Sequence, residues 1–209
     1  MNKNKTLLII VLVFVLLLGG AYVLYNRLAQ DAAPDQLSVQ GGAEAQTAPQ
    51  SEKPQQNTGG SGDESTEPEK ILAPDFTVYD SEGNEVHLSD FTGKPIVLNF
   101  WASWCGPCKM EMPDFDDAYA ELGEDVHFLM VNMTSGRETL ESATSFIEEQ
   151  GYSFPVYYDT DADAAMTYGV YSLPTTLFID AEGYGIAQAT GAINAETLQR
   201  GINMILPKK

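Results

Sequence analysis

The side chains of this sequence that are best suited to chemistry are two cysteines, Cys105 and Cys108. They are the only cysteines in the sequence. They lie in the stretch NFWASWCGPCKMEMP, which runs from Asn99 to Pro113. A pair with this spacing can serve as a structural disulfide, as part of a metal site, or as a redox-active dithiol. The rest of the sequence bears on which of the three roles applies.

A structural disulfide between Cys105 and Cys108 would contribute little stability. It would close a loop of four residues, for which the chain-entropy relation gives at most about 2 kcal/mol. The sequence is 44% hydrophobic, which is ample for a core without a covalent staple. The spacing therefore argues against a purely structural role.

A metal site at the cysteine pair would lack further ligands. A structural zinc site requires four ligands, and the two histidines, His87 and His127, are isolated in the sequence. We therefore predict no metal site and no cofactor. A module that carries a sulfur-ligated metal such as copper is the remoter alternative.

A redox dithiol fits the position of the pair. Cys105 follows an apolar stretch that is predicted to be a buried strand and precedes a predicted helix, whose free N–H groups and dipole favour a thiolate and lower its pKa. Pro107 is tolerated in the first helical turn, where N–H groups have no partner within the helix. Cys108 lies one turn further, where it could resolve a mixed disulfide formed by Cys105.

The elements that must position this pair alternate between strands and helices. Hydrophobic periodicity and turn residues predict a hairpin over 76–88, strands over 95–101, 126–133 and 154–159, helices over 105–122, 138–150, 161–168 and 195–206, and a second hairpin over 175–190. This order indicates an α/β domain with a mixed sheet that is covered on both faces.

The stretch FWASWCGPCKM resembles the active site of thioredoxins, and its wider context resembles the TlpA-like and ResA-like membrane-anchored thiol-disulfide oxidoreductases. The resemblance extends from about Ile71 to the C-terminus. It implies the thioredoxin fold, with an N-terminal hairpin and a helix–strand unit inserted between Cys108 and Pro174. It also implies that Cys105 and Cys108 form a redox disulfide.

The same resemblance suggests where a substrate binds. The segment SLPTTLFID matches a family segment that contains a cis-proline, so Pro174, with Leu173 before it, is expected to face the cysteines and to expose backbone groups to a substrate peptide. Trp104, Gly106 and Pro107 are the further substrate-binding residues that the resemblance implies. A trans proline in an ordinary turn is the alternative at Pro174.

A proton-handling group is expected at Glu111. Thioredoxins carry a buried aspartate at the position of Asn99, which cannot take a proton, and the ResA-like branch instead uses a glutamate three residues after the second cysteine. Glu111 matches that glutamate, and its one-turn spacing places it on the side of the helix that carries Cys108. We expect a raised pKa and a catalytic role in proton exchange; a solvated helix glutamate like Glu121 is the alternative.

The N-terminus resembles a membrane anchor. Residues 7–25 (LLIIVLVFVLLLGGAYVLY) carry no charge and are long enough, as a helix, to cross a hydrocarbon core of roughly 30 Å. Lys3 and Lys5 precede this segment, which predicts a cytoplasmic tail over 1–6 and a catalytic domain outside a bacterial cell membrane, with a single pass. A cleaved signal peptide is the alternative, but LAQDAA is a poor cleavage site.

The remaining boundaries follow from composition. Residues 26–70 are rich in Gln, Gly, Ser, Glu and Pro, so we expect a disordered acidic linker. The thioredoxin-like domain is expected over 71–209. A formal net charge of −19 disfavours nucleic acid as a partner.

The predicted function is that of an extracytoplasmic, membrane-tethered thiol-disulfide oxidoreductase. The resemblance implies that it reduces disulfides in exported proteins, such as apocytochrome c or proteins of envelope and spore biogenesis, and receives electrons from a thiol-transfer protein in the membrane. An oxidant or isomerase that uses the same residues is the main alternative. A peroxidase would need a threonine three residues before its reactive cysteine, where Ala102 stands before Cys105.

Overall fold

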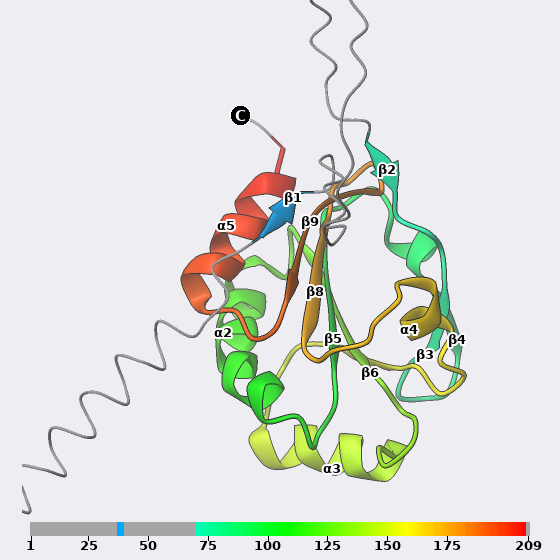
Figure 1. Ribbon diagram of the computed structural model, residues 1–209. Helices are drawn as coiled ribbons and strands as arrows, with labels where there is room; N and C mark the ends of the chain where they lie inside the picture. Colours follow the sequence, from blue (N-terminus) through cyan, green and yellow to red (C-terminus); the bar gives the residue numbers. More distant parts are fainter. Residues whose placement is uncertain (1–36, 40–69, 208–209) are drawn as a thin grey trace, which may run out of the picture. The chain divides into compact units, whose positions relative to one another are not determined.

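The computed structural model describes residues 37–39 and 70–207. In this part of the chain, nine strands form one mixed sheet in the order β1-β9-β8-β5-β6-β7-β3-β4, with β2 also paired to β9 (Figure 1). The strands are β1 (Ser38–Val39), β2 (Ile71–Leu72), β3 (Thr77–Tyr79), β4 (Glu85–His87), β5 (Ile96–Trp101), β6 (His127–Asn132), β7 (Val156–Tyr158), β8 (Thr175–Ile179) and β9 (Tyr184–Thr190).

The central strand β5 organises the sheet. All six of its residues are buried, because it lies between two neighbours: β6 pairs with it in parallel and β8 in antiparallel orientation. The apolar stretch IVLNFW suits this position, since a strand covered on both faces has no solvent side that requires polar residues. Asn99 is the exception within this strand.

Two apolar clusters cover the two faces of the sheet. Val97 and Trp101 point into a cluster that includes residues of α2 (Gly106–Leu122), α3 (Leu140–Gln150) and α5 (Ala195–Ile205). The alternate residues of β5 point into a second cluster with β3, the 3-10 helix η1 (Leu88–Phe91) and α4 (Asp163–Thr167). Figure 1 shows α2 and α5 on one side of the sheet and α4 on the other. This arrangement follows from the period of two in strand side chains.

Residues at the helix ends explain where the main helices begin and end. Thr139 caps α3 by accepting a hydrogen bond from the Ser142 N–H, and α3 ends at Gly151, whose φ of 72° is the left-handed conformation that glycine favours. Asn194 caps α5 in the same way through the Thr197 N–H. Gly201 lets α5 approach β8 so closely that a Cβ atom there would overlap the Phe178 ring.

The expected strands and helices are present, with ends that differ by a few residues. A helix–strand unit, α3 and β7, is present between Cys108 and Pro174, where the sequence predicts one, and the N-terminal hairpin consists of β3 and β4 around Gly83. The predicted linker over 26–70 is wrong in one place: residues 38 and 39 form β1, which pairs with Gln188 and Ala187 of β9. An edge strand offers unpaired N–H and C=O groups to any nearby segment, whatever its composition.

No helix in the described ranges is long and apolar enough to cross a membrane. The predicted tail over 1–6, the predicted span over 7–25 and the linker other than residues 37–39 and 70 lie outside those ranges.

Candidate active site

Cys105 and Cys108 form a disulfide where β5 leads into α2. Cys105 is the N-cap residue of α2, and its Cα atom lies 5.3 Å from that of Cys108. The Cys105 N–H donates to the Ala102 carbonyl oxygen at 3.0 Å, which fixes the turn after β5. The pair therefore lies at the start of the helix that the sequence predicts over 105–122.

Cys105 lies against the free backbone donors at the start of α2. Its Sγ atom accepts a hydrogen bond from the Cys108 N–H at 3.1 Å, one of the helix-start donors that lack a partner within the helix. The relative exposure of Cys105 is 3% and that of Cys108 is 0%. Cys105 is thus the more accessible residue of the pair, although both are buried in the disulfide form.

Glu111 lies one turn after Cys108, and its carboxyl group is buried in the core. Its relative exposure is 1%. Its Oε1 atom accepts from the Asn99 Nδ2 at 2.8 Å, and its Oε2 atom accepts from the Ile193 N–H at 2.9 Å. Cys108 and Glu111 share the buried side of α2, as their spacing predicts, so the alternative of a solvated glutamate is wrong.

Burial raises the pKa of Glu111 to about 8. The loss of hydration is the largest cause, the hydrogen bonds from the Ile193 N–H and Asn99 act in the opposite direction, and the charge of Asp114 adds a smaller rise. At neutral pH this carboxyl group is therefore mostly protonated while the cysteines are in the disulfide form. The expected raised pKa is confirmed, and its role in catalysis stays a prediction.

Asn99 is arranged to partner the carboxyl group in either protonation state. Its Nδ2 atom donates both to Glu111 and to the Thr176 Oγ1, the latter at 3.0 Å, while its buried Oδ1 atom has no partner among the described residues. Rotating the amide by half a turn would let Oδ1 accept from a protonated Glu111 and from the Thr176 hydroxyl. Because Asn99 stands where thioredoxins carry an aspartate, Glu111 is the acid that can titrate beside it.

The substrate-binding residues that the sequence predicts lie at this end of the sheet. The Leu173–Pro174 bond is cis, as expected. Pro174 precedes β8, whose first residue is paired with Phe100, the neighbour of Trp101 at the end of β5. Leu173 packs against the apolar cluster that includes both cysteines. Gly106 and Pro107 are exposed at the start of α2, and the relative exposure of Trp104 is 45%.

A second buried acid, Glu138, holds the segment before the cysteines in place, and no sequence signal pointed to it. Its Oε1 atom accepts from the Ser103 N–H and from the Asn132 Nδ2, both at 2.9 Å, and its Oε2 atom accepts from the Ser103 hydroxyl at 2.8 Å. In the sequence it resembles an ordinary acid before a helix. Its partner Ser103 lies 35 residues away, beyond the reach of local pattern analysis.

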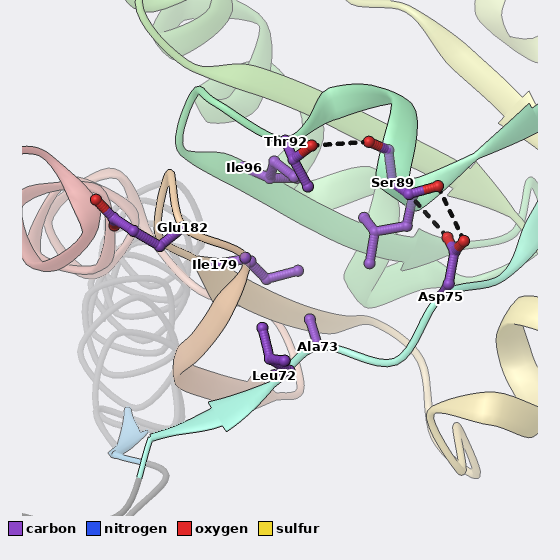
Figure 2. Close-up of a pocket in the computed structure, with 10 residues that line it drawn as sticks. Leu72, Ala73, Asp75, Ser89, Thr92, Ile96, Ile179 and Glu182 are labelled. Atoms are coloured by element: carbon purple, nitrogen blue, oxygen red, sulfur yellow. Dashed lines mark hydrogen bonds between the residues drawn. The ribbon is translucent and has the colours of Figure 1, made fainter.

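A cavity of about 100 Å³ lies at the start of β5, the end of this strand opposite the cysteines. Figure 2 shows side chains that line it. It is lined by side chains around β2, η1 and the hairpin between β8 and β9, including Leu72, Ile96 and Ile179. This cavity is therefore separate from the redox pair. Within residues 37–39 and 70–207, no three His, Cys, Asp or Glu side chains are grouped as ligands of a metal ion.

Replacing Glu111 by Gln should remove a pH dependence of stability. Because the pKa in the folded protein is about 8 and the ordinary value is 4.5, the folded state holds the proton that the unfolded state has lost between these values. The free energy of unfolding of the disulfide form should therefore fall as pH rises from about 4.5 to about 8, by on the order of a few kcal/mol. Urea unfolding at pH 5 and pH 8.5 measures this fall.

The Gln side chain can fit, since a rotated Asn99 amide would accept from its Nε2 while its oxygen accepts from the Ile193 N–H. We expect Glu111→Gln to be more stable than the unaltered protein at pH 8.5. The control is Glu121→Gln, which changes an exposed glutamate of the same helix. Equal pH dependence in the two variants would contradict the assignment.

Comparison with known proteins agrees with this geometry. The AhpC/TSA family matches residues 71–184. The chain is 36% identical over 136 residues to the thiol-disulfide oxidoreductase ResA of Bacillus thuringiensis subsp. konkukian, covering 65% of this chain and 77% of the relative. It is 35% identical over 136 residues to ResA of Bacillus subtilis, covering 65% and 74%.

Solved structures show the same fold. StoA from Bacillus subtilis superposes with a TM-score of 0.55 at 26% identity, covering 63% of this chain and 97% of StoA. The exposed lipoprotein thioredoxin of Streptococcus pneumoniae gives a TM-score of 0.56 at 32% identity, covering 62% and 98%. With a cysteine disulfide at the start of a helix and a cis-proline at the neighbouring strand, the chain belongs to the AhpC/TSA family of the thioredoxin superfamily, as a ResA-like thiol-disulfide oxidoreductase.

Proposed function

We propose that this thiol-disulfide oxidoreductase works as a reductant of protein disulfides outside the cytoplasm, tethered to the membrane by residues 7–25. The observation that carries the proposal is the Cys105–Cys108 disulfide at the start of α2 with the buried Glu111 one turn further. The Gly-Pro pair between the cysteines supports the reductive direction, because thioredoxin, with a potential of about −270 mV, carries the same pair.

In the reductive half-reaction, the Cys105 thiolate attacks one sulfur of a substrate disulfide. A mixed disulfide forms, and the other substrate sulfur leaves as a thiolate. The Cys108 sulfur then attacks Cys105 Sγ, which releases the second substrate thiol and forms the Cys105–Cys108 disulfide. Two electrons pass to the substrate, and a membrane dithiol protein then supplies two further electrons that reduce the Cys105–Cys108 disulfide, becoming a disulfide itself.

Glu111 supplies a proton route for Cys108 in both directions. When Cys108 attacks, its thiol proton passes to the Glu111 carboxylate. When the donor later reduces the enzyme disulfide, the protonated Glu111 returns the proton to the departing Cys108 sulfur. A pKa of about 8 suits both transfers, because neither protonation state is strongly disfavoured near neutral pH.

The proposed substrates are disulfides of exported proteins, with apocytochrome c and proteins of envelope or spore biogenesis as the candidates that the family resemblance supplies. Leu173, Pro174 and Trp104 would border the substrate chain. Pairing with the backbone next to a cis-proline is independent of side chains, so the same site suits several sequences.

The reduction potential of the full chain in detergent tests the direction. We expect a value below about −230 mV against glutathione, since a reductant must hold its electrons more weakly than its substrates. A value above about −180 mV would instead favour an oxidant or isomerase of exported proteins.

Replacing Cys108 by Ser should trap the substrate. Without the resolving sulfur, Cys105 stays joined to the substrate cysteine, so non-reducing gels of cells that express Cys108→Ser should show mixed disulfides. Cys105→Ser is the matched control and should show none. Adducts of equal amount in both variants would contradict the assignment of Cys105 as the attacking sulfur.

Topology can be tested independently of chemistry. Protease added to intact bacterial spheroplasts should digest the domain from residue 71 onward, while a cytoplasmic marker protein stays intact. A domain that is cut only after lysis would overturn the extracytoplasmic placement.

A further inference from the structure

The described residues contain five lysine and arginine side chains against 22 aspartates and glutamates. Three of the five are bound away from the cysteines. Lys70 pairs with Asp180 at 3.2 Å, and Arg200 pairs with Glu196 at 3.4 Å. Lys94 donates to the Glu124 carbonyl oxygen at 2.7 Å. The positive charge of this acidic domain is thus partly used in structural contacts.

The other two cations flank the cysteine pair. The guanidinium carbon of Arg137 lies 3.7 Å from the centre of the Trp104 ring, and Trp104 directly precedes Cys105. Lys109 directly follows Cys108, and its Nζ atom lies 5.0 Å from the centre of the Phe146 ring. Within the described ranges, no carboxylate lies at ion-pair distance from either cation.

Stacking leaves the Arg137 charge available to a ligand. A guanidinium group that lies on an aromatic ring uses its face, while its N–H donors point outward in its plane and suit a carboxylate. Arg137 and Trp104 are both exposed. The side chain therefore presents a fork of donors, without an ion-pair partner among the described residues, over the ring of the residue that precedes Cys105.

The position of Arg137 is fixed by its neighbour. Glu138 is 3% exposed and accepts three hydrogen bonds, two of them from Ser103, which directly precedes Trp104. Glu138 thus holds the backbone before the cysteines, and its neighbour Arg137 covers the Trp104 ring. A group that is held before the ligand arrives loses less entropy on binding.

We propose that Arg137 and Lys109 form a cationic rim that selects protein disulfides whose cysteines are flanked by aspartate or glutamate. The rim is defined as the Arg137 guanidinium on Trp104 together with the Lys109 ammonium. It sets the specificity of the reaction proposed above, and the inference rests on that function. The rest of the acidic surface attracts positively charged partners, whereas the rim attracts negatively charged residues beside the substrate disulfide.

The test compares three peptides that contain the same intramolecular disulfide, with two Asp, two Asn or two Lys residues beside the cysteines. The second-order rate constant for their reduction by the pre-reduced full chain is measured. The unaltered protein should prefer Asp to Asn and Asn to Lys. Arg137→Gln should lower the Asp-to-Asn ratio about fivefold, which is the upper end for an exposed ion pair.

Two further variants separate charge from structure. Arg137→Lys keeps the charge and should retain part of the preference, while Arg137→Glu should favour the Lys peptide. Lys94→Gln is the matched control, because Lys94 lies at the opposite end of β5 from the cysteines, and it should leave the ratio unchanged. The preference of the unaltered protein should also weaken between low salt and 0.5 M salt, as exposed charges are screened.

Equal ratios in the unaltered protein and Arg137→Gln would overturn the rim. A loss of rate that is the same for all three peptides would also overturn it, since that result assigns Arg137 to the thiolate or to the loop rather than to the substrate. If the unaltered protein reduced none of the peptides, the proposed reductase function itself would fail and the rim with it.

Discussion

A carboxyl group that is buried in an apolar core must give up its charge or find donors. Glu111 has two donors, one from β5 and one from the segment that leads into α5. These bonds tie α2, which carries the cysteines, to the central strand and to the last helix. Loss of hydration outweighs them, so the carboxyl group holds its proton up to about pH 8. The interaction that anchors the active-site helix thus also keeps a protonated carboxyl group one helical turn after Cys108.

Two buried acids hold the chain on either side of the cysteine pair. Glu111, on α2 after Cys108, has two donors and a raised pKa. Glu138 accepts three hydrogen bonds, from Asn132 and from Ser103, which lies in the segment before Cys105. Both acids replace water with donors fixed by the fold. The backbone around Cys105 is therefore held from both directions by buried hydrogen bonds.

Much of the fold could be predicted because the signals are local. The apolar stretch before Cys105 predicted a strand buried on both faces, and β5 is buried along its whole length. Hydrophobic periodicity predicted a helix over 138–150, and α3 spans Leu140–Gln150, so its bounds were predicted to within two residues. The segment at residues 38 and 39 escaped prediction, because pairing with the edge of β9 uses backbone groups that every residue has.

Spacing in the sequence was enough to predict a dithiol at a helix start and to place Glu111 one turn after Cys108 on the same side of the helix. The expected proton role of Glu111 came from the resemblance to the ResA-like branch. Tertiary structure decided what surrounds them. The contacts of Glu138 with Ser103 and of Arg137 with Trp104 join segments that are more than 30 residues apart. No local pattern encodes such contacts, because an acid or an arginine before a helix looks the same in sequence whether it faces water or a partner. Only the folded chain shows which side chain lies beside the reactive sulfur.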